Sequence, residues 1–542
     1  MDKKLTSKNI WSVCKVNGNC KSVDSMKYLY SQFPLIQDAA NAINDELKKI
    51  CSFDAPQLHQ NTRDNIRTDD SRSHITTNLQ IDEEKVWAYL KKLKTNKASQ
   101  DIPNILYKKA ASIIVAPLTY LFNLSLSRME VPTIWKTCAV IPVPKSPTPS
   151  TNEIRPISLM PVPLKILERI VTDNIKEDLL NLYGKDQFGF RPGSSTACAL
   201  ISLHQAIMRY LDSRDVNGVQ LLAYDYSKAF DTLLISTVMK RLEGGNFDAG
   251  IKCWLQDYLK DRRQYVKLGN TRSHIIRVDK GVPQGSVLGP HLFSAVTGTL
   301  DVSLEDCHAV LYADDVTLCV PLYRNSSNLH VLRIHQKIVN WSCDNGLILN
   351  DKKCKSLLIT ASKNCVGVSI QNISFVTSLC ILGVTFNARG NWRCHIEKVV
   401  RNASRRLHPI RILKYNFGVN DDILKTVYFA TVRSILEYCA PLLLGLSVSD
   451  SNGVNKIQRR FHKMLCGSHC KEDCLPDLHS RRMRLGLQLL ERMKQPGHIL
   501  NHLLPTYSTS GRIILPVCRT KRFSNSFIFQ ISLAFNDAFK RK

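Results

Sequence analysis

The sequence has no apolar run long enough to cross a membrane and no dense pattern of cysteines. Its longest apolar stretch, APLLLGLSV at residues 440–448, falls far short of the roughly 18 residues that a membrane helix needs. The first residues, MDKKLTSKNI, lack the apolar segment of a secretory signal. Eighteen cysteines without regular spacing indicate reduced thiols rather than a disulfide scaffold. These absences predict an intracellular protein, in nucleus and cytoplasm, with no membrane partner.

Negative charge is also scarce. The chain has 74 Lys and Arg against 46 Asp and Glu, which leaves a formal net charge of +28. A surplus of that size usually marks a polyanionic partner, and without a membrane we expect that partner to be nucleic acid. A chain of 542 residues is also too long for one ordinary core, so we expect about two to four packed units.

Pattern and composition divide the chain into four regions. Residues 1–80 are polar and weakly periodic, which predicts an N-terminal linker or extension, with the stretch HQNTRDNIRTDDSRSH as linker. Over residues 81–385 helices and hairpins alternate irregularly, which favours an α+β domain on an antiparallel sheet. This region should hold helices at 117–129 and 163–183 and a core strand at 218–226. Residues 386–470 are helical and basic, and residues 471–542 form a C-terminal tail.

Two adjacent acids, Asp314 and Asp315, lie in the stretch LYADDVTLCV with apolar strand formers on both sides. The pattern predicts a hairpin with the acids at its bend. An Asp-rich turn is the simplest explanation, because Asp is common in turns. A third acid changes the interpretation: Asp225 ends the probable core strand in LLAYDYSKAFD. Acids at neighbouring strand ends repel one another, and shared divalent cations such as Mg²⁺ would offset that repulsion.

Several motifs together resemble a reverse transcriptase. They are RPISL, FGFRPGSST, AYDYSKAFDTL, KGVPQGSVLGPHLF and YADD, in that order along the chain. The longer forms RPISLMPVPLKILERIV, NGLILNDKKCKSLLI and LGVTFNARGNWRCHIEKVVRNASRRL are similar to the non-LTR retrotransposon branch, of LINE type and jockey-like. The resemblance runs from about residue 80 to about residue 500. It implies a right-hand polymerase fold, with fingers and an antiparallel-sheet palm over 81–385 and a basic helical thumb over 386–470.

The resemblance also implies roles for single residues. Asp225, Asp314 and Asp315 match the catalytic acids that bind two Mg²⁺ ions, and Lys353 matches a palm lysine that protonates or neutralises the leaving pyrophosphate. For Lys353 an ordinary surface lysine remains the alternative.

Four further residues match positions that bind the incoming nucleotide. Lys145 in VPKS and Arg155 in RPISL match residues of the fingers that hold its triphosphate, with plain surface positions as the alternative. Phe230 matches the aromatic side chain that crowds a ribose 2′-hydroxyl, and a helix core aromatic is the alternative. Gln284 in GVPQGS matches the residue that lies against nucleotide and template.

The remaining motifs concern nucleic acid and zinc. From Arg389 to Lys414 the chain has eight Lys or Arg and one acid, and Arg401, Arg405 and Arg406 fall on helical spacings that could follow a phosphate backbone. Arg191 in GFRPG is expected to contact template backbone, and a structural salt bridge is the alternative. The hairpin expected at ILGVTF matches the one that holds the primer end. Cys466, Cys470 and Cys474 lack the tight pairing of most structural zinc sites, so no zinc is predicted.

The sequence therefore predicts an RNA-directed DNA polymerase that extends a DNA primer on an RNA template with dNTPs. The alternative is a catalytically silent, RNA-binding descendant, and the retained acids argue against it. A group II intron maturase would need an intron-type DNA-binding tail, which is not recognised. Residues 1–80 leave no room for the upstream endonuclease of autonomous elements, so we expect the polymerase part of an element. Oligomeric state has no signature in the sequence.

Overall fold

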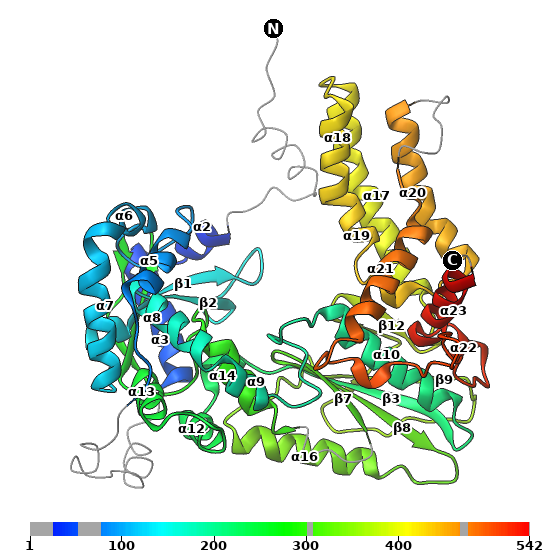
Figure 1. Ribbon diagram of the computed structural model, residues 1–542, viewed down its shortest axis with the longest axis horizontal. Helices are drawn as coiled ribbons and strands as arrows, with labels where there is room; N and C mark the ends of the chain where they lie inside the picture. Colours follow the sequence, from blue (N-terminus) through cyan, green and yellow to red (C-terminus); the bar gives the residue numbers. More distant parts are fainter. Residues whose placement is uncertain (1–24, 53–76, 301–306, 467–474, 541–542) are drawn as a thin grey trace.

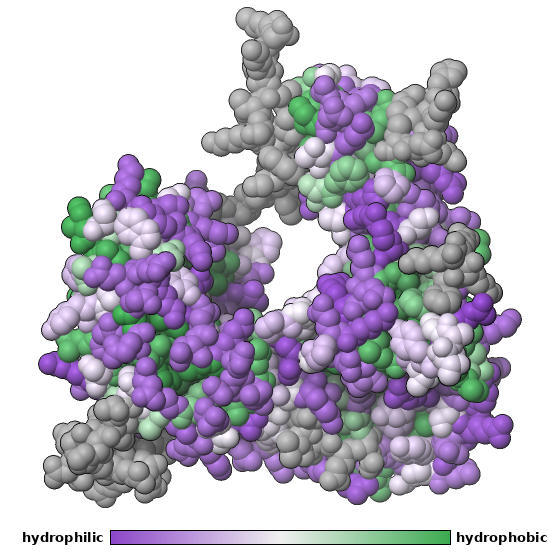
Figure 2. Space-filling model, viewed as in Figure 1, coloured by the Kyte–Doolittle hydropathy of each residue, from purple (hydrophilic) through white to green (hydrophobic). Residues whose placement is uncertain are grey.

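The computed structural model describes residues 25–52, 77–300, 307–466 and 475–540, and it shows two lobes joined by a shared base (Figure 1). One lobe carries the N-terminal helices and a first sheet, and the other carries a second sheet with a tall helical bundle above it. In the space-filling view the two lobes enclose an open space bordered mostly by hydrophilic residues (Figure 2). The expected linker stretch at 59–74 lies outside the described residues.

The first sheet builds the fingers. Its strands are β1 (Thr137–Pro144), β2 (Ile154–Leu159), β4 (Arg262–Leu268), β5 (Thr271–Arg272) and β6 (Ile276–Val278), in the order β2-β1-β4-β5 with β6 paired to β4. β1 and β2 are antiparallel, which places Val143 opposite Arg155. The prolines of β1 and β2 thus lie in short strands, and a loop joins these two strands.

Helices cover this sheet and fill the lobe. They are α5 (Glu83–Lys92), α6 (Asn104–Lys109), α7 (Ala111–Ser127), α8 (Val162–Asn174), α9 (Lys176–Asn181), α12 (Ile235–Glu243) and α13 (Ala249–Leu259). The helix expected at 117–129 begins earlier, so Pro117 lies inside α7, where it lacks the amide for an i→i−4 bond. The helix expected at 163–183 is divided at Ile175 into α8 and α9. The turn at Ile175 changes the direction of the chain, so Leu179 and Leu182 pack with the second helix rather than in line with the first.

The prediction of a linker throughout residues 1–80 is wrong for one stretch. Residues Ile36–Cys51 form helix α3, preceded by α2 (Ser25–Tyr30). Ala39, Ala40, Ile43 and Leu47 form its buried face, which joins Val266 and Leu268 of β4 in one small core. The polar composition of the region concealed this helix, because its short apolar face lies against a strand more than 200 residues away.

The second sheet is the palm. Its strands run in the order β10-β9-β3-β8-β7, with β3 (Val216–Tyr224) in the centre, flanked by β8 (Asp315–Tyr323) and β9 (Lys355–Thr360), and with β7 (His308–Tyr312) and β10 (Ser374–Phe375) at the edges. Both neighbours of β3 are antiparallel to it. Side chains alternate across this sheet: Leu221 faces the core that contains α10 (Thr196–Asp212), and Leu222 faces the core that contains α16 (His330–Asp344).

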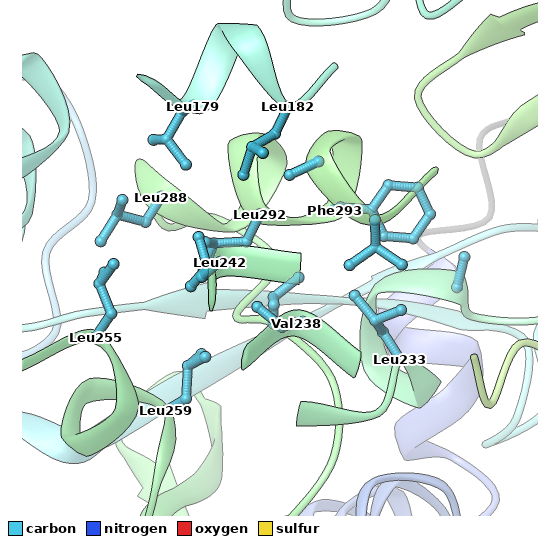
Figure 3. Close-up of a cluster of buried hydrophobic side chains, with 14 of the residues drawn as sticks. Leu179, Leu182, Leu233, Val238, Leu242, Leu255, Leu259, Leu288, Leu292 and Phe293 are labelled. Carbon is cyan, nitrogen blue, oxygen red and sulfur yellow. The ribbon is translucent and has the colours of Figure 1, made fainter. Parts of the chain in front are cut away.

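Helix α14 (Leu288–Thr297) runs through the core where fingers and palm meet. Figure 3 shows Leu288, Leu292 and Phe293 of this helix among side chains from its neighbours. Those neighbours are Leu179 and Leu182 after α8, Leu233, Val238 and Leu242 near α12, and Leu255 and Leu259 of α13. Because all these side chains are buried, the position of α14 is fixed from several directions.

The thumb rises from a short hairpin, β11 (Ser378–Ile381) and β12 (Val384–Asn387), as expected for ILGVTF. Its main helices are α17 (Arg393–Tyr415), α18 (Asp421–Tyr428), α20 (Val448–Cys466) and α21 (Leu478–Met493). Tyr428 and Phe461 stack between α18 and α20 with ring centroids 3.9 Å apart. α17 and α18 lie on the side of the thumb toward the fingers, and α20 lies on the far side (Figure 1).

The C-terminal helices α22 (Lys521–Ser524) and α23 (Phe527–Lys540) pack back onto the palm and thumb rather than forming a separate tail. The carboxylate of Asp212, at the end of α10, accepts hydrogen bonds from the backbone amides of Arg519 and Thr520. No helix in the described part of the chain is long and apolar enough to cross a bilayer. The architecture confirms the predicted α+β class and the right-hand arrangement of fingers, palm and thumb.

Candidate active site

The three predicted acids converge at one end of the palm sheet. Asp225 follows the last residue of β3, Asp314 lies in the bend between β7 and β8, and Asp315 is the first residue of β8. Tyr224 pairs with Val316 and Tyr312 pairs with Asp315, so the backbone of Asp225 comes next to that of Asp315. The predicted hairpin is confirmed, and its bend lies beside the end of the core strand because the strands are antiparallel neighbours.

Mutual repulsion and loss of water shape the charges of this group. Burial raises the pKa of Asp314 above its usual range, Asp225 adds to the rise, and Arg155 and Lys353 oppose it. Burial also raises the pKa of Asp315 to about 6, and Asp314 and Asp225 raise it further. Asp315 as a whole residue is exposed, and only its carboxylate lies in surroundings that are partly closed to water. Carboxylates under such repulsion gain from a nearby cation.

Lys353 supplies one such cation. Its ammonium lies 3.2 Å from the carboxylate of Asp225, and it is 59% exposed against 33% for the aspartate. The backbone holds both partners: the carbonyl of Asp225 accepts from the amide of Asn350, and the carbonyl of Asn350 accepts from the amide of Lys353. The lysine predicted from LNDKKCK therefore reaches the acids through a turn anchored to the end of β3.

The donor set suits a hard divalent cation, because it offers only carboxylate oxygens, the ligands that Mg²⁺ prefers. Within the described ranges, no three His, Cys, Asp or Glu side chains are gathered closely enough to enclose an ion as they stand. The carboxylates of the three acids are suitable ligands for Mg²⁺, and in this structure the ammonium of Lys353 is the cation paired with Asp225.

Gln187 holds the bend of the hairpin, and its role was not among the predictions from the sequence. Its side chain is 1% exposed. Its Oε1 accepts from the amide of Ala313 at 3.2 Å and from the amide of Gly189 at 2.8 Å, while its Nε2 donates to Thr297. Ala313 has a positive φ of 57° beside the acids. The side chain of Gln187 thus stabilises a backbone shape that alanine adopts only at a cost. Its place in the FGFRPG region was the only available signal.

Phe230 lies in α11 (Ala229–Thr232), five residues after Asp225. Its ring stacks on that of Phe293 from α14, with centroids 4.5 Å apart and planes within 19°. Its carbonyl accepts from the amide of Val282 at 2.7 Å. Phe230 is half-buried, so one part of the ring is packed and the rest remains accessible. This position suits a rigid wall at the edge of the site, although part of the ring does belong to the core.

Arg155 and Lys145 lie on the fingers and face different parts of the site. Arg155 is exposed on β2 and close enough to Asp314 to lower its pKa. Lys145 is exposed just after β1 and acts instead on α11. Burial raises the pKa of Asp231 to about 6 against the opposing charges of Lys228, Arg262 and Lys145. Lys228, which was not predicted as a site residue, therefore adds a cation beside Asp231.

Gln284 lies on a loop fastened to β2. Its carbonyl accepts from the amide of Ser158 at 2.8 Å. Gly285 follows with φ +125°, and a Cβ there would lie 2.5 Å from the Ser158 carbonyl oxygen, so only glycine fits. The predicted nucleotide loop is therefore a fixed element rather than a flexible one. α3 contributes as well, because the carbonyl of Cys51 accepts from the amides of Asp279 and Lys280.

The other predicted contacts are distributed around the opening. Arg191 donates to the carbonyls of Gln187 and Gly184, which is a structural role without an acidic partner. In α17, Arg401 and Arg405 are exposed on one face, and Arg406 is exposed beside them. The region of Cys470 and Cys474 lies outside the described residues.

Comparison with known proteins agrees with this arrangement. Residues 143–386 match the family model described as "Reverse transcriptase (RNA-dependent DNA polymerase)". The chain is 27% identical over 439 residues to the "Probable RNA-directed DNA polymerase from transposon BS" of Drosophila melanogaster, covering 75% of this chain and 47% of that protein. It is 27% identical over 304 residues to the "RNA-directed DNA polymerase from mobile element jockey" of the same species, covering 52% of this chain and 32% of that one.

Among solved structures, the apo telomerase of Candida tropicalis matches with a TM-score of 0.37 and 11% identity, over 66% of this chain and 62% of that one. The chain spans about half the length, or less, of the curated relatives that it matches. Over residues 143–386 the chain is thus similar to reverse transcriptases, and the curated proteins that it resembles are RNA-directed DNA polymerases of retrotransposons.

Proposed function

We propose that this chain is an RNA-directed DNA polymerase that extends a DNA primer on an RNA template. The observation that supports this most strongly is the convergence of Asp225, Asp314 and Asp315 at one end of the palm sheet, opposite Arg155 on the fingers. The repulsion among these acids has no structural benefit of its own. It is useful in a site that gathers cations around a phosphoryl group, and the family match and the named relatives give the class of reaction.

The proposed reaction is nucleotidyl transfer. The 3′-oxygen of the primer attacks the α-phosphate of a dNTP, a new phosphodiester bond forms, and the bond to pyrophosphate breaks. Reverse transcriptases use divalent metal ions, and two Mg²⁺ ions held by Asp225, Asp314 and Asp315 would supply the charge that activates the 3′-hydroxyl and stabilises the leaving group. Arg155 and Lys145 would hold the triphosphate, because guanidinium and ammonium groups bind phosphate oxygens from the exposed face of the fingers.

Lys353 has two tasks in this proposal. Before cations bind, its ammonium is paired with Asp225 and offsets part of the repulsion among the acids. When cations take over that role, the ammonium is released toward the product side, where it would neutralise or protonate pyrophosphate. Its exposure of 59% leaves it free to move by a rotamer change.

Selection of substrate follows from two fixed walls. Phe230, backed by Phe293, would exclude a ribose 2′-hydroxyl and so favour dNTPs. The Gln284 loop, fastened to Ser158, would lie against the base pair that forms between nucleotide and template. Exposed arginines of α17 would bind the phosphate backbone of the RNA–DNA duplex without reading its sequence.

The experiment is primer extension on poly(rA) with oligo(dT), dTTP and Mg²⁺, run beside an Asp314→Asn variant. We expect extension by the parent chain and loss of extension in the variant, with template–primer affinity retained in both. A parent chain that binds RNA but never extends the primer would favour a silent RNA-binding descendant. Extension that survives in the variant would contradict the role of Asp314.

A further inference from the structure

A carboxylate that the reaction scheme does not use is completely buried in the fingers. Glu168 lies in α8 and is 0% exposed. Its Oε1 accepts three hydrogen bonds, from the hydroxyl of Tyr258 at 2.9 Å, the amide of Val287 at 2.9 Å and the amide of Leu288 at 2.8 Å. A carboxylate taken out of water needs such partners, so its position in the core requires an explanation.

The two amides belong to the first turn of α14. Leu288 is the first residue of that helix, and Val287 before it provides no side-chain cap. The first amides of any helix lack partners within the helix, and they carry partial positive charge. Glu168 supplies the missing acceptor from another helix, 119 and 120 residues away in the sequence. Ser286 satisfies the next amide, that of Gly289, at 2.8 Å.

A buried cation holds the other end of the same loop. Arg262 is 7% exposed, and its guanidinium donates to the carbonyls of Lys280 at 2.8 Å and Gly281 at 2.6 Å. Gln284 lies between these two anchored ends, and its own carbonyl is bonded to Ser158. The loop from 280 to 288 is therefore held by the guanidinium of Arg262 at its start, by the Oε1 of Glu168 at its end and by β2 in the middle.

We propose that Glu168 and Arg262 are positioning residues that clamp the two ends of this loop and thereby set the place of the Gln284 side chain against the incoming nucleotide. The inference rests on the proposed polymerase function for its kinetic meaning. Glu168 also fixes α14, which carries Phe293 behind Phe230, so the same clamp supports the wall that selects the sugar. Neither residue touches the substrate, and each acts through the loop.

Kinetics separate this role from simple support of the fold. Glu168→Ala leaves the amides of Val287 and Leu288 without an acceptor, and we expect kcat/KM for dTTP to fall by about 10- to 100-fold, mainly through KM, as for other displaced positioning elements. Glu168→Gln keeps an acceptor oxygen in place, so it should retain most of the kcat/KM that Glu168→Ala loses. Affinity for the template–primer should stay within about twofold in both, because the thumb is untouched.

Leu167→Ala is the matched control. Leu167 is the neighbouring residue of the same helix and is also 0% exposed, but its side chain is purely apolar. It should lower the unfolding temperature through a cavity and leave KM unchanged. Arg262→Met, which removes the nitrogen that donates to both carbonyls, should raise KM as Glu168→Ala does. An equal rise of KM in the Leu167 variant would overturn the proposal.

Hydrogen exchange gives a readout that needs no activity. In the full chain the amides of Val287 and Leu288 should be protected, and Glu168→Ala should expose them to exchange while amides of the palm strand β3 stay protected. Unchanged protection at both amides would refute the clamp. A parent chain that shows the protection but never extends a primer would refute the proposed function alone, so the two failures are distinguishable.

Discussion

Replacing Gly285 with alanine tests whether the nucleotide loop is as rigid as its contacts imply. The new Cβ would lie 2.5 Å from the carbonyl oxygen of Ser158, a backbone atom that cannot rotate away, and the φ of +125° is unfavourable for alanine. The strained backbone costs about 1–3 kcal/mol, and loss of the Ser158–Gln284 hydrogen bond adds about 0.5–1.5 kcal/mol. Together these terms give about 1.5–4.5 kcal/mol.

That energy should appear in nucleotide use. If the chain relieves the clash by moving Gln284 away from β2, kcat/KM for dTTP falls by about 10- to 1500-fold, since about 1.4 kcal/mol corresponds to tenfold. The assay is steady-state extension of oligo(dT) on poly(rA), with thermal unfolding of the same preparations measured in parallel.

Gly269→Ala is the control for this variant. Gly269 also has a positive φ, +61°, but a Cβ there meets nothing within 4 Å. It lies in the β4–β5 turn, so alanine should lower the stability by about 1–2 kcal/mol and leave kcat/KM unchanged. A Gly285→Ala chain with normal kcat/KM and normal stability would refute the account of a loop locked against β2.

Three further predictions follow from the charges. Lys353→Met removes a cation that lowers the pKa of Asp314 and Asp315, so the acidic limb of the pH–rate profile should move to higher pH and kcat should fall by about tenfold or more. An acidic limb that does not move would contradict the influence of Lys353 on these acids. Replacing both Arg401 and Arg405 with glutamine should lower the slope of log affinity for template–primer against log salt concentration by about two. Arg393→Gln should change this slope less, because Arg393 is already paired with Glu397 at 3.1 Å. Burial lowers the pKa of His204 and of His395 to about 4, below the unfolded value near 6.5, so their contribution to stability is present above about pH 6.5 and is lost as the pH falls toward 4. Urea unfolding across this range should show the free energy of unfolding decreasing with falling pH, and His204→Phe should make that decrease shallower.

The sequence was most informative where chemistry and local pattern coincide. The hairpin with Asp314 and Asp315 at its bend, the strand that ends before Asp225 and the basic helices after residue 387 were all predictable. In these segments the period of apolar residues and the type of turn residue determine the local structure without distant partners. The named motifs then indicated the resemblance to reverse transcriptases. In the structure, the register of the strands brings the three acids together.

The contacts that hold the site could not be read from the sequence. Glu168, Arg262 and Gln187 bond mainly to backbone amides and carbonyls, and backbone groups leave no residue-specific pattern. Apart from two short contacts, to Gly189 and Leu259, their partners lie from 18 to 126 residues away, so no local window contains both ends of these contacts.

Helix α3 was hidden for a related reason, because its partner is a strand of the fingers sheet rather than anything near it in the chain. The break at Ile175 likewise depends on where α14 lies, since Leu179 and Leu182 turn toward that helix (Figure 3). Tertiary packing decided both cases against an interpretation based on local periodicity alone.

Binding of Mn²⁺, followed by electron paramagnetic resonance, tests the central claim most directly. Mn²⁺ takes oxygen ligands as Mg²⁺ does, and its free signal falls when it binds. In the presence of template, primer and dTTP on a chain-terminated primer, the parent should bind Mn²⁺, and Asp225→Asn and Asp314→Asn should each lose most of that binding while keeping the template–primer. Equal Mn²⁺ binding by the parent and both variants would contradict the assignment of these acids.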